Sequence, residues 1–310
     1  MPYLDDDHGQ AYYRHWSASD PRAAVIFLHG FGEHTGLYDR YGTALNAAGI
    51  DLWAVDQLGH GQSPGERGQF GTLEDSSALA EALTKLAESH SPGVPLVAQG
   101  HSYGAVVTLF RLLENPDRYR AGIISGAPLV PIAELVDLNT AMNLDVAGLS
   151  TDPVYLDLIE NDPLALTNAD SRNLTRELDR GWDRFGAELP KLTVPTLAVH
   201  GEIDPIADPG AVRAYAEQIP ALRYQEFAGT RHAVLNDTTH AEVTAAIIAF
   251  IGEQTQTRTE RAEIVRVCVC SREVHYSQVS GVVVVRKASR SSRHCAGVVL
   301  SGSMPVYSPR

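Results

Sequence analysis

The first 252 residues alternate between short apolar runs and longer stretches with a helical pattern. The apolar runs lie at 23–28, 51–55, 94–98, 121–125, 195–199 and 222–227. Apolar positions recur at helical spacing within 37–48, 73–90, 103–114, 208–219 and 239–251. Near-continuous apolar strands that alternate with helices predict a parallel sheet covered by helices on both faces. Residues 11–16 predict an additional antiparallel strand at the sheet edge.

The alternation breaks between residues 128 and 191, where no strand pattern occurs for about 60 residues. The segment holds helical pieces at 131–146, 153–160 and 171–185, separated by Asp-Pro pairs at 152–153 and 162–163. A structureless loop of this length would be improbable in a compact domain. We therefore expect residues 128–190 to form a helical cap over the carboxyl ends of the strands, and 1–127 with 191–252 to form the core.

The composition changes after residue 252. Residues 253–310 contain nine Lys and Arg against four Asp and Glu, although the whole chain of 310 residues has a net charge of −13. All three cysteines, Cys268, Cys270 and Cys295, lie in this tail, at a spacing that does not match common zinc sites. We expect 253–310 to be an atypical, disordered C-terminal tail, with a partner-binding segment as the alternative.

The acidic balance excludes some classes of function. Nucleic-acid binding requires a basic face, so we expect no nucleic-acid partner. No apolar run approaches the roughly 20 residues of a membrane-spanning helix, and the first residues show no secretory signal pattern. We expect a cytoplasmic protein with no metal and no organic cofactor. No part of the sequence indicates an oligomeric state.

Residues 100–104 read Gly-His-Ser-Tyr-Gly and match the G-x-S-x-G pattern. An apolar strand precedes them and a helical pattern follows, which is the strand–turn–helix context of a nucleophile elbow. Such an elbow exposes a serine hydroxyl at a sharp turn, and the flanking glycines relieve steric clashes. The alternative is an ordinary glycine-rich turn. Ser102 is the candidate nucleophile.

A second motif, His29-Gly-Phe-Gly-Glu-His34, directly follows the strand predicted at 23–28. Acyl transfer requires backbone N–H groups that stabilise a developing oxyanion. One comes from the residue after the nucleophile and one from this earlier loop. These criteria identify the backbone N–H groups of Tyr103 and Phe31 as the oxyanion hole; the alternative is a plain glycine-bearing turn.

An acid and a histidine follow the serine in the order that this mechanism needs. Asp204 comes after the strand at 195–199, and His232 comes after the strand at 222–227. His232 would take the proton of Ser102, and Asp204 would orient the imidazole and stabilise its charged form. Asp208 is a rival acid, although its place before a proline suits a helix N-cap. His60 is a rival base, more typical of a residue that braces a loop.

Together these motifs resemble the monoacylglycerol lipase and lysophospholipase branch of the α/β-hydrolases. The resemblance rests on HGFGEH (29–34), DQLGHGQSPGERG (56–68), GHSYG (100–104), HGEID (200–204) and GTRH (229–232). It implies an eight-stranded, mostly parallel sheet with a helical cap between the sixth and seventh strands. It also implies that the serine, acid and histidine above cleave an acyl ester of glycerol. Two positions depart from the branch: Tyr103 stands where Met is common, and its bulk could narrow the acyl pocket, whereas Gln57 replaces His or Arg.

The expected function is that of a serine hydrolase that cleaves carboxylic esters, most simply monoacylglycerols or lysophospholipids, through an acyl-enzyme. Alternatives on the same fold are an aminopeptidase, a C–C hydrolase, a cofactor-free haloperoxidase and a non-catalytic ligand receptor. An aminopeptidase would need carboxylates for a substrate ammonium, and the predicted cap has Asp152, Asp157, Glu160, Asp162 and Asp170. The cap is also rich in apolar residues between 129 and 149, which favours either core packing or transient contact with lipid aggregates.

Overall fold

The computed structural model describes residues 2–6, 9–132, 142–143 and 146–255, and three short strands beyond them. The chain divides into two units, Met1–Thr255 and Gln256–Arg310. In the second unit, β11 (Tyr276–Val279), β12 (Val282–Val285) and β13 (Val298–Leu300) form an antiparallel sheet. The remaining tail residues, including the three cysteines, lie outside the described residues, so the expectation of a disordered tail stays a prediction.

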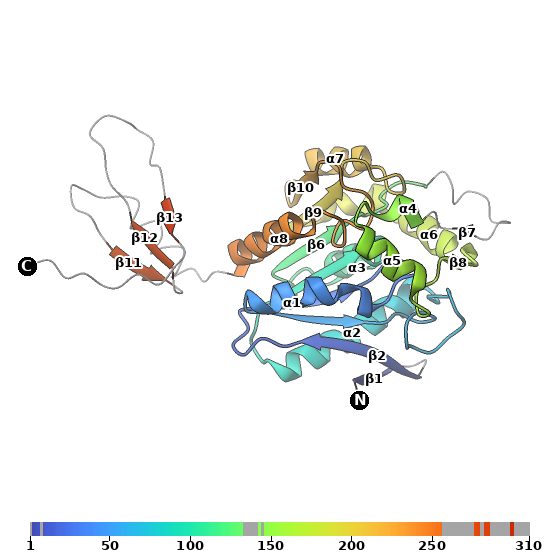
Figure 1. The fold of residues 1–310 in the computed structure, drawn as a ribbon, viewed down its shortest axis with the longest axis horizontal. Helices are drawn as coiled ribbons and strands as arrows, with labels where there is room; N and C mark the ends of the chain where they lie inside the picture. Colours follow the sequence, from blue (N-terminus) through green and yellow to red (C-terminus); the bar gives the residue numbers. More distant parts are fainter. Residues whose placement is uncertain are drawn as a thin grey trace, which may run out of the picture. The chain divides into compact units, whose positions relative to one another are not determined.

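An eight-stranded sheet forms the centre of the first unit, in the order β1-β2-β4-β3-β5-β6-β9-β10 (Figure 1). Its strands are β1 (Tyr3–Asp6), β2 (Gly9–Trp16), β3 (Ala23–Leu28), β4 (Ile50–Val55), β5 (Leu96–His101), β6 (Ala121–Ser125), β9 (Thr196–Gly201) and β10 (Leu222–Phe227). All six apolar runs are strands, and the six are parallel to one another. Strand β2 is antiparallel to β4, as expected, but it is not the edge, because β1 pairs with its other side.

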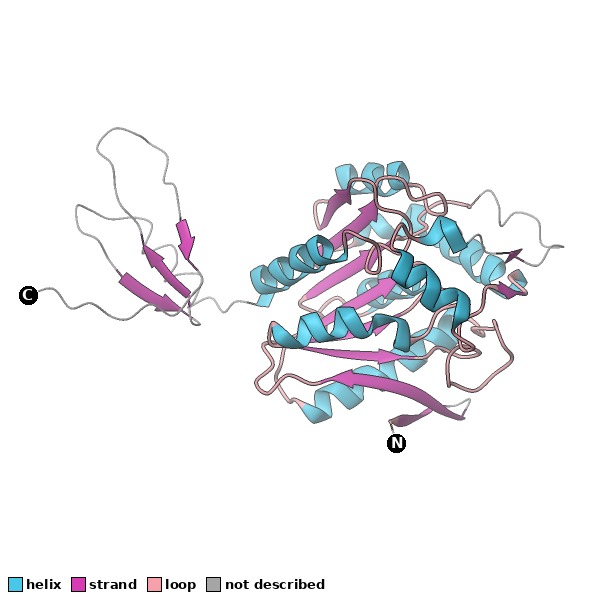
Figure 2. Ribbon diagram, in the orientation of Figure 1, coloured by secondary structure: helices cyan, strands magenta, loops and turns pink. Residues whose placement is uncertain are grey.

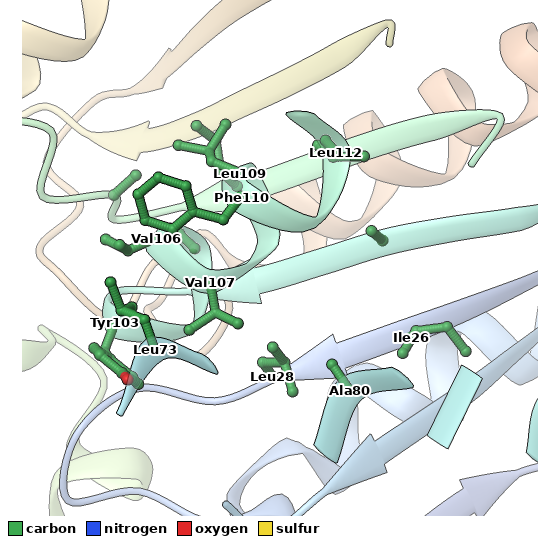
Figure 3. Packing of buried hydrophobic residues seen from close by; sticks show 14 of the residues in the cluster. Ile26, Leu28, Leu73, Ala80, Tyr103, Val106, Val107, Leu109, Phe110 and Leu112 are labelled. Atoms are coloured by element: carbon green, nitrogen blue, oxygen red, sulfur yellow. The ribbon is translucent and has the colours of Figure 1, made fainter. Parts of the chain in front are cut away.

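Helices cover both faces of the sheet (Figure 2). They are α1 (Asp39–Ala47), α2 (Leu73–His90), α3 (Tyr103–Glu114), α7 (Pro209–Gln218) and α8 (His240–Thr255). Successive side chains of a strand point to opposite faces. In β3, Ile26 and Leu28 accordingly pack with α2 and α3 (Figure 3), whereas Val25 and Phe27 pack with α1 and α8. This two-sided burial explains the continuous apolar runs.

The segment expected to form the cap lies between β6 and β9, the sixth and seventh strands of the eight-stranded sheet in chain order. In chain order it contains β7 (Met142–Asn143), α4 (Val146–Leu149), α5 (Pro153–Asn161), β8 (Asn168–Ala169) and α6 (Arg172–Glu188), followed by the short 3-10 helix η3 (Leu189–Lys191). The helix expected over 131–146 is partly wrong, because 142–143 pair with 168–169 as a short antiparallel ladder. The rest of that range up to residue 145 is outside the described residues, except 131–132, which are not helical.

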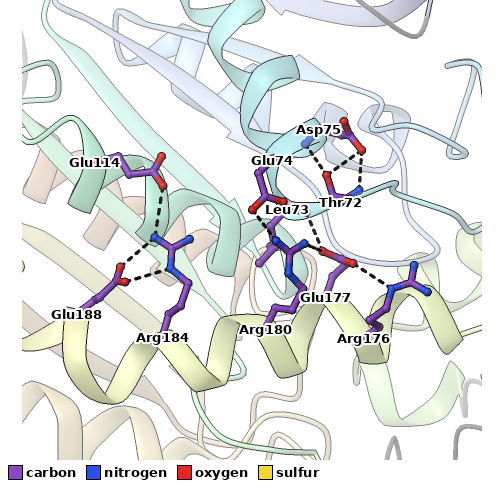
Figure 4. A network of polar contacts seen from close by, with 10 residues as sticks. All are labelled: Thr72, Leu73, Glu74, Asp75, Glu114, Arg176, Glu177, Arg180, Arg184 and Glu188. Carbon is purple, nitrogen blue, oxygen red and sulfur yellow. Dashed lines mark hydrogen bonds and ion pairs between the residues drawn. The ribbon is translucent and has the colours of Figure 1, made fainter.

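Helix α6 is joined to the start of α2 by a polar network (Figure 4). The buried Glu177 carboxylate accepts a hydrogen bond from the backbone N–H of Leu73 at 2.9 Å. Arg180 bridges Glu177 and Glu74, at 2.6 Å from each. The free N–H groups of a helix N-terminus favour an anionic partner, so Glu177 also stabilises the N-terminus of α2.

The strand register brings four loops to the same edge of the sheet. Leu28 lies beside Gly100, His101 beside Ser125, Ser125 beside Val199, and Gly201 beside Phe227. The loops that follow β3, β5, β9 and β10 therefore emerge together at the carboxyl edge, which is where open parallel sheets place their ligand sites.

Candidate active site

Ser102 occupies a strained turn between β5 and α3. Its φ is 51° and its ψ is −118°, and among the described residues it is the one non-glycine with positive φ. A Cβ on Gly100 would lie 2.0 Å from the Gly104 carbonyl oxygen, and a Cβ on Gly104 would lie 2.2 Å from that of Leu28. Both glycines are therefore required by close backbone approach, and the turn has the geometry of the predicted elbow.

The loop of residues 29–34, called the oxyanion loop below, lies directly beside Ser102. A Cβ on Gly30 would be 3.0 Å from the Ser102 Cβ. Gln57 holds the start of this loop: its side-chain amide donates to the His29 carbonyl, and its backbone N–H donates to His29 Nε2. Within the described part of the chain, no hydrogen bond uses the N–H of Phe31 or of Tyr103. Both donors are thus available to an oxyanion.

Asp204 and His232 form a buried pair in which His232 Nδ1 lies 2.9 Å from Asp204 Oδ2. The other carboxylate oxygen, Oδ1, accepts hydrogen bonds from the backbone N–H groups of Ile206 and Ala207 at 2.8 and 3.0 Å. His200 Nε2 lies 3.0 Å from Asp204 Oδ2. The carboxylate is thereby fixed in orientation, and it fixes that of the His232 ring.

This environment separates the pKa values of the pair. Burial opposes ionisation of Asp204, but His232 and His200 outweigh it and hold the pKa of Asp204 far below its ordinary value. Burial acts to lower the pKa of His232, yet Asp204 and, more weakly, Glu33 raise it above its ordinary value. Asp204 is therefore charged at neutral pH, and it makes the His232 imidazole more basic.

The raised pKa of His232 predicts the pH dependence of the reaction. As the expected base, His232 must be neutral to accept a proton from Ser102, so we expect activity to be retained above its pKa and lost as the pH falls through it. We expect the acid-side midpoint of kcat/KM to lie above 6.5, the ordinary histidine value. A pH profile with a soluble p-nitrophenyl ester measures this midpoint, and a value below 6.5 would contradict the prediction.

The rival residues have structural contacts. Asp208 is exposed at the N-cap of α7, where its side chain accepts a hydrogen bond from the Gly210 N–H at 2.8 Å. His60 is fully buried, its ring is stacked 4.2 Å from that of Phe70, and burial lowers its pKa to about 3. Neither has the partner that Asp204 and His232 find in each other.

The Tyr103 side chain packs into the core cluster that contains α2 and α3. Its ring is fully buried and stacked 4.0 Å from that of Phe70, and its hydroxyl lies 3.2 Å from Ser76 Oγ. Core packing therefore accounts for the large residue at this position. Whether the ring also bounds an acyl pocket stays a prediction.

Three further side chains at the site were not expected from the sequence. His200 contacts Asp204, and Glu33 and Tyr155 form a buried hydrogen bond beside the oxyanion loop. Glu33 carried a signal, since it lies within the motif at 29–34 that was expected to form the oxyanion hole. Tyr155 carried none, because its partner lies 122 positions away.

The described residues show two further negative results. They contain no group of three or more His, Cys, Asp or Glu side chains that could hold a metal ion. None of the helices described for this chain is long and apolar enough to cross a membrane.

Residues 19–239 match the family model described as serine aminopeptidase, S33. The chain is 26% identical over 235 residues to a monoacylglycerol lipase of Mycolicibacterium smegmatis, covering 71% of this chain and 84% of that one. It is 29% identical over 229 residues to the human monoglyceride lipase, covering 67% and 74%.

Solved structures agree on the fold. A soluble variant of the Saccharomyces cerevisiae monoglyceride lipase in complex with a substrate analogue aligns with a TM-score of 0.72 at 21% identity, over 82% of this chain and 95% of that one. These findings confirm the expected fold class and the resemblance inferred from the motifs. The chain belongs to the family described as serine aminopeptidase, S33, and has the α/β-hydrolase fold.

Proposed function

We propose that this chain hydrolyses the ester bond of monoacylglycerols or lysophospholipids with Ser102 as nucleophile, His232 as base and Asp204 as the group that orients the base. The observation that carries the proposal is the strained turn at Ser102, on the same sheet edge as the buried His232–Asp204 pair. A serine without a catalytic role would not need this backbone conformation.

The residues support a two-step reaction. Ser102 Oγ attacks the ester carbonyl while His232 Nε2 takes its proton, and the backbone N–H groups of Phe31 and Tyr103 bind the oxyanion. His232 then protonates the departing glycerol oxygen, which leaves an acyl group on Ser102. Water attacks this acyl-enzyme with His232 again as base, and the fatty acid departs.

The lipid substrate class follows from the relatives, several of which are named monoacylglycerol or monoglyceride lipases. The family description names an aminopeptidase, so that activity is the second candidate. An aminopeptidase would need unpaired carboxylates in the cap to bind the ammonium group of its substrate. Asp152 binds Arg40, Asp162 binds His34, Asp170 binds Arg172, and Asp157 accepts a hydrogen bond from Asn161. Four of the five carboxylates therefore have a partner, and the fifth, Glu160, is exposed on α5. A single exposed carboxylate is a weak ammonium site, which favours the ester substrate.

A substrate panel tests the proposal. We expect the protein to release fatty acid from monoacylglycerols in a series of acyl chain lengths. It should release no amine from aminoacyl naphthylamides. Cleavage of the amides without cleavage of the glycerides would overturn the lipase assignment. A wild-type protein that cleaves neither and is not labelled by a fluorophosphonate would support the receptor alternative.

We also propose that residues 128–190 act as the cap over a core of 1–127 and 191–252, and that the cap touches lipid aggregates. Val154 and Leu158 of α5 are 63% and 50% exposed, and their spacing of four places them on one face of the helix. Exposed apolar pairs of this kind suit insertion at a lipid surface.

Replacing both Val154 and Leu158 with serine is expected to reduce activity on aggregated monoacylglycerol by about fivefold, because less apolar area enters the lipid. Activity on a soluble short-chain ester should remain unchanged. Rates above and below the critical micelle concentration measure the difference. An equal loss on both substrates would show that the pair acts on the fold and not on lipid contact.

A further inference from the structure

We infer that Glu33 is a positioning residue for the oxyanion loop and that Tyr155 of the cap holds it in place, so that cap and oxyanion hole form one hydrogen-bonded unit. This inference rests on the proposed ester hydrolysis. The new element is the hydroxyl of Tyr155 in the cap. This group is distant from the triad in sequence, yet transition-state stabilisation would depend on it.

The Glu33 carboxylate is 5% exposed and receives three hydrogen bonds from three different segments. The Gly30 N–H donates to Oε2 at 2.9 Å, the Tyr38 hydroxyl donates to the same oxygen at 2.6 Å, and the Tyr155 hydroxyl donates to Oε1 at 2.8 Å. Because Gly30 precedes the predicted donor Phe31 and lies against Ser102, the position of Glu33 sets where the Phe31 N–H points.

The carboxylate is in its charged form. Burial opposes ionisation, but the hydroxyl of Tyr38 and, at the acidic pH where His101 is itself charged, the His101 ring outweigh it, so the pKa of Glu33 lies below its ordinary value. Hydrogen bonds to a charged group are stronger than those between neutral groups. The three donors therefore anchor the loop firmly, and the loss of any one leaves a buried charge less well compensated.

Two further contacts join the cap to the oxyanion loop. The Leu166 N–H donates to the Gly32 carbonyl at 2.8 Å, and His34 Nε2 lies 3.0 Å from Asp162 Oδ2. A Cβ on Gly32 would lie 2.5 Å from the Leu166 carbonyl oxygen, so the two segments are in direct contact. The Tyr103 N–H is fixed by α3, whereas the Phe31 N–H depends on a loop that the cap supports.

Glu33 also faces the catalytic base. Its Oε2 is 4.0 Å from His101 Nε2, and the His101 ring centroid is 4.9 Å from that of His232. Asp204 and Glu33 are the charged groups that raise the pKa of His232, and His101, whose own pKa burial lowers to about 4, stands between Glu33 and the base as a neutral ring. Removing the charge of Glu33 therefore has an effect that loosening the loop does not.

Two substitutions separate these effects in the full-length protein. Tyr155→Phe removes one hydroxyl and keeps the ring, so we expect kcat on p-nitrophenyl butyrate to fall about tenfold with KM within twofold, because a misplaced oxyanion donor acts on the transition state. Glu33→Gln removes the charge, so we expect a fall in kcat of about 100-fold and an acid-side midpoint of kcat/KM lower by about 0.5 pH.

The matched control is Tyr119→Phe. Tyr119 is also buried, and its hydroxyl accepts a hydrogen bond from Arg111 at 2.9 Å, away from the oxyanion loop. We expect Tyr119→Phe to lower the unfolding temperature about as much as Tyr155→Phe does. Its kcat and its rate of fluorophosphonate labelling should equal those of the wild type.

The outcomes distinguish this inference from the proposed function. A wild-type protein without ester hydrolysis overturns the proposed function. An active wild type with Tyr155→Phe at wild-type kcat, or with Tyr119→Phe equally impaired, overturns the inference. A Glu33→Gln variant whose pH midpoint does not move overturns the electrostatic part.

Discussion

Ser102→Ala is expected to abolish ester hydrolysis, with kcat reduced by about a millionfold. Alanine keeps the Cβ and the strained backbone of the turn but removes the atom that forms the acyl-enzyme. The oxyanion donors and the His232–Asp204 pair remain, so only the residual rate that binding and electrostatics supply should persist. Fluorophosphonate labelling followed by intact-mass measurement checks this directly, since the wild type should gain one adduct and the variant none.

Ser17→Ala provides the control, because Ser17 is exposed and outside the site. It should be labelled at the wild-type rate. An adduct that persists on Ser102→Ala protein with an unchanged unfolding temperature would place the nucleophile elsewhere and contradict the elbow assignment.

Asp204→Asn is expected to lower kcat by about ten-thousandfold while the protein stays folded. The amide has nearly the shape of the carboxylate, but it cannot stabilise a charged imidazole, and its NH₂ group favours the wrong tautomer of His232. Because Asp204 is the main group that raises the pKa of His232, the remaining activity should also have a lower acid-side midpoint.

Asp208→Asn is the matched control for this experiment. It lies four residues further on, is exposed, and caps α7, where asparagine serves as well as aspartate. We expect wild-type kcat and stability. If Asp208→Asn were inactive and Asp204→Asn active, Asp208 would be the acid that orients His232, and the assignment of Asp204 would be contradicted.

Much of the core could be predicted because a strand buried on both faces leaves a continuous apolar run. Strands β3, β6 and β10 agree with their predicted ranges, as do helices α2 and α3. Strand β1 could not be predicted, because its sequence Tyr-Leu-Asp-Asp has no such run and it forms only by pairing with β2 at the edge. The cap was harder for a similar reason, since the pairing of β7 with β8 joins residues that are far apart in the chain.

The order of the candidate site residues could be predicted because each follows a strand whose end lies on a common edge. The contacts among them could not. The hydrogen bond from Tyr155 to Glu33, and the ion pair of His34 with Asp162, depend on how the cap folds back over the loop. No local pattern encodes such a contact.

The strand order has a consequence for how the chain folds while it is synthesised. Strand β4 pairs with one side of β3, and β5, β6, β9 and β10 then add one after another on the other side. Domains fold as the chain emerges, N-terminus first, so the sheet can grow outward in the order of translation. Ser102, the proposed nucleophile, is then placed long before His232, its proposed base, which follows β10, the last strand of the eight-stranded sheet. A nascent chain therefore cannot assemble the proposed site until β10 and the loop that carries His232 have left the ribosome.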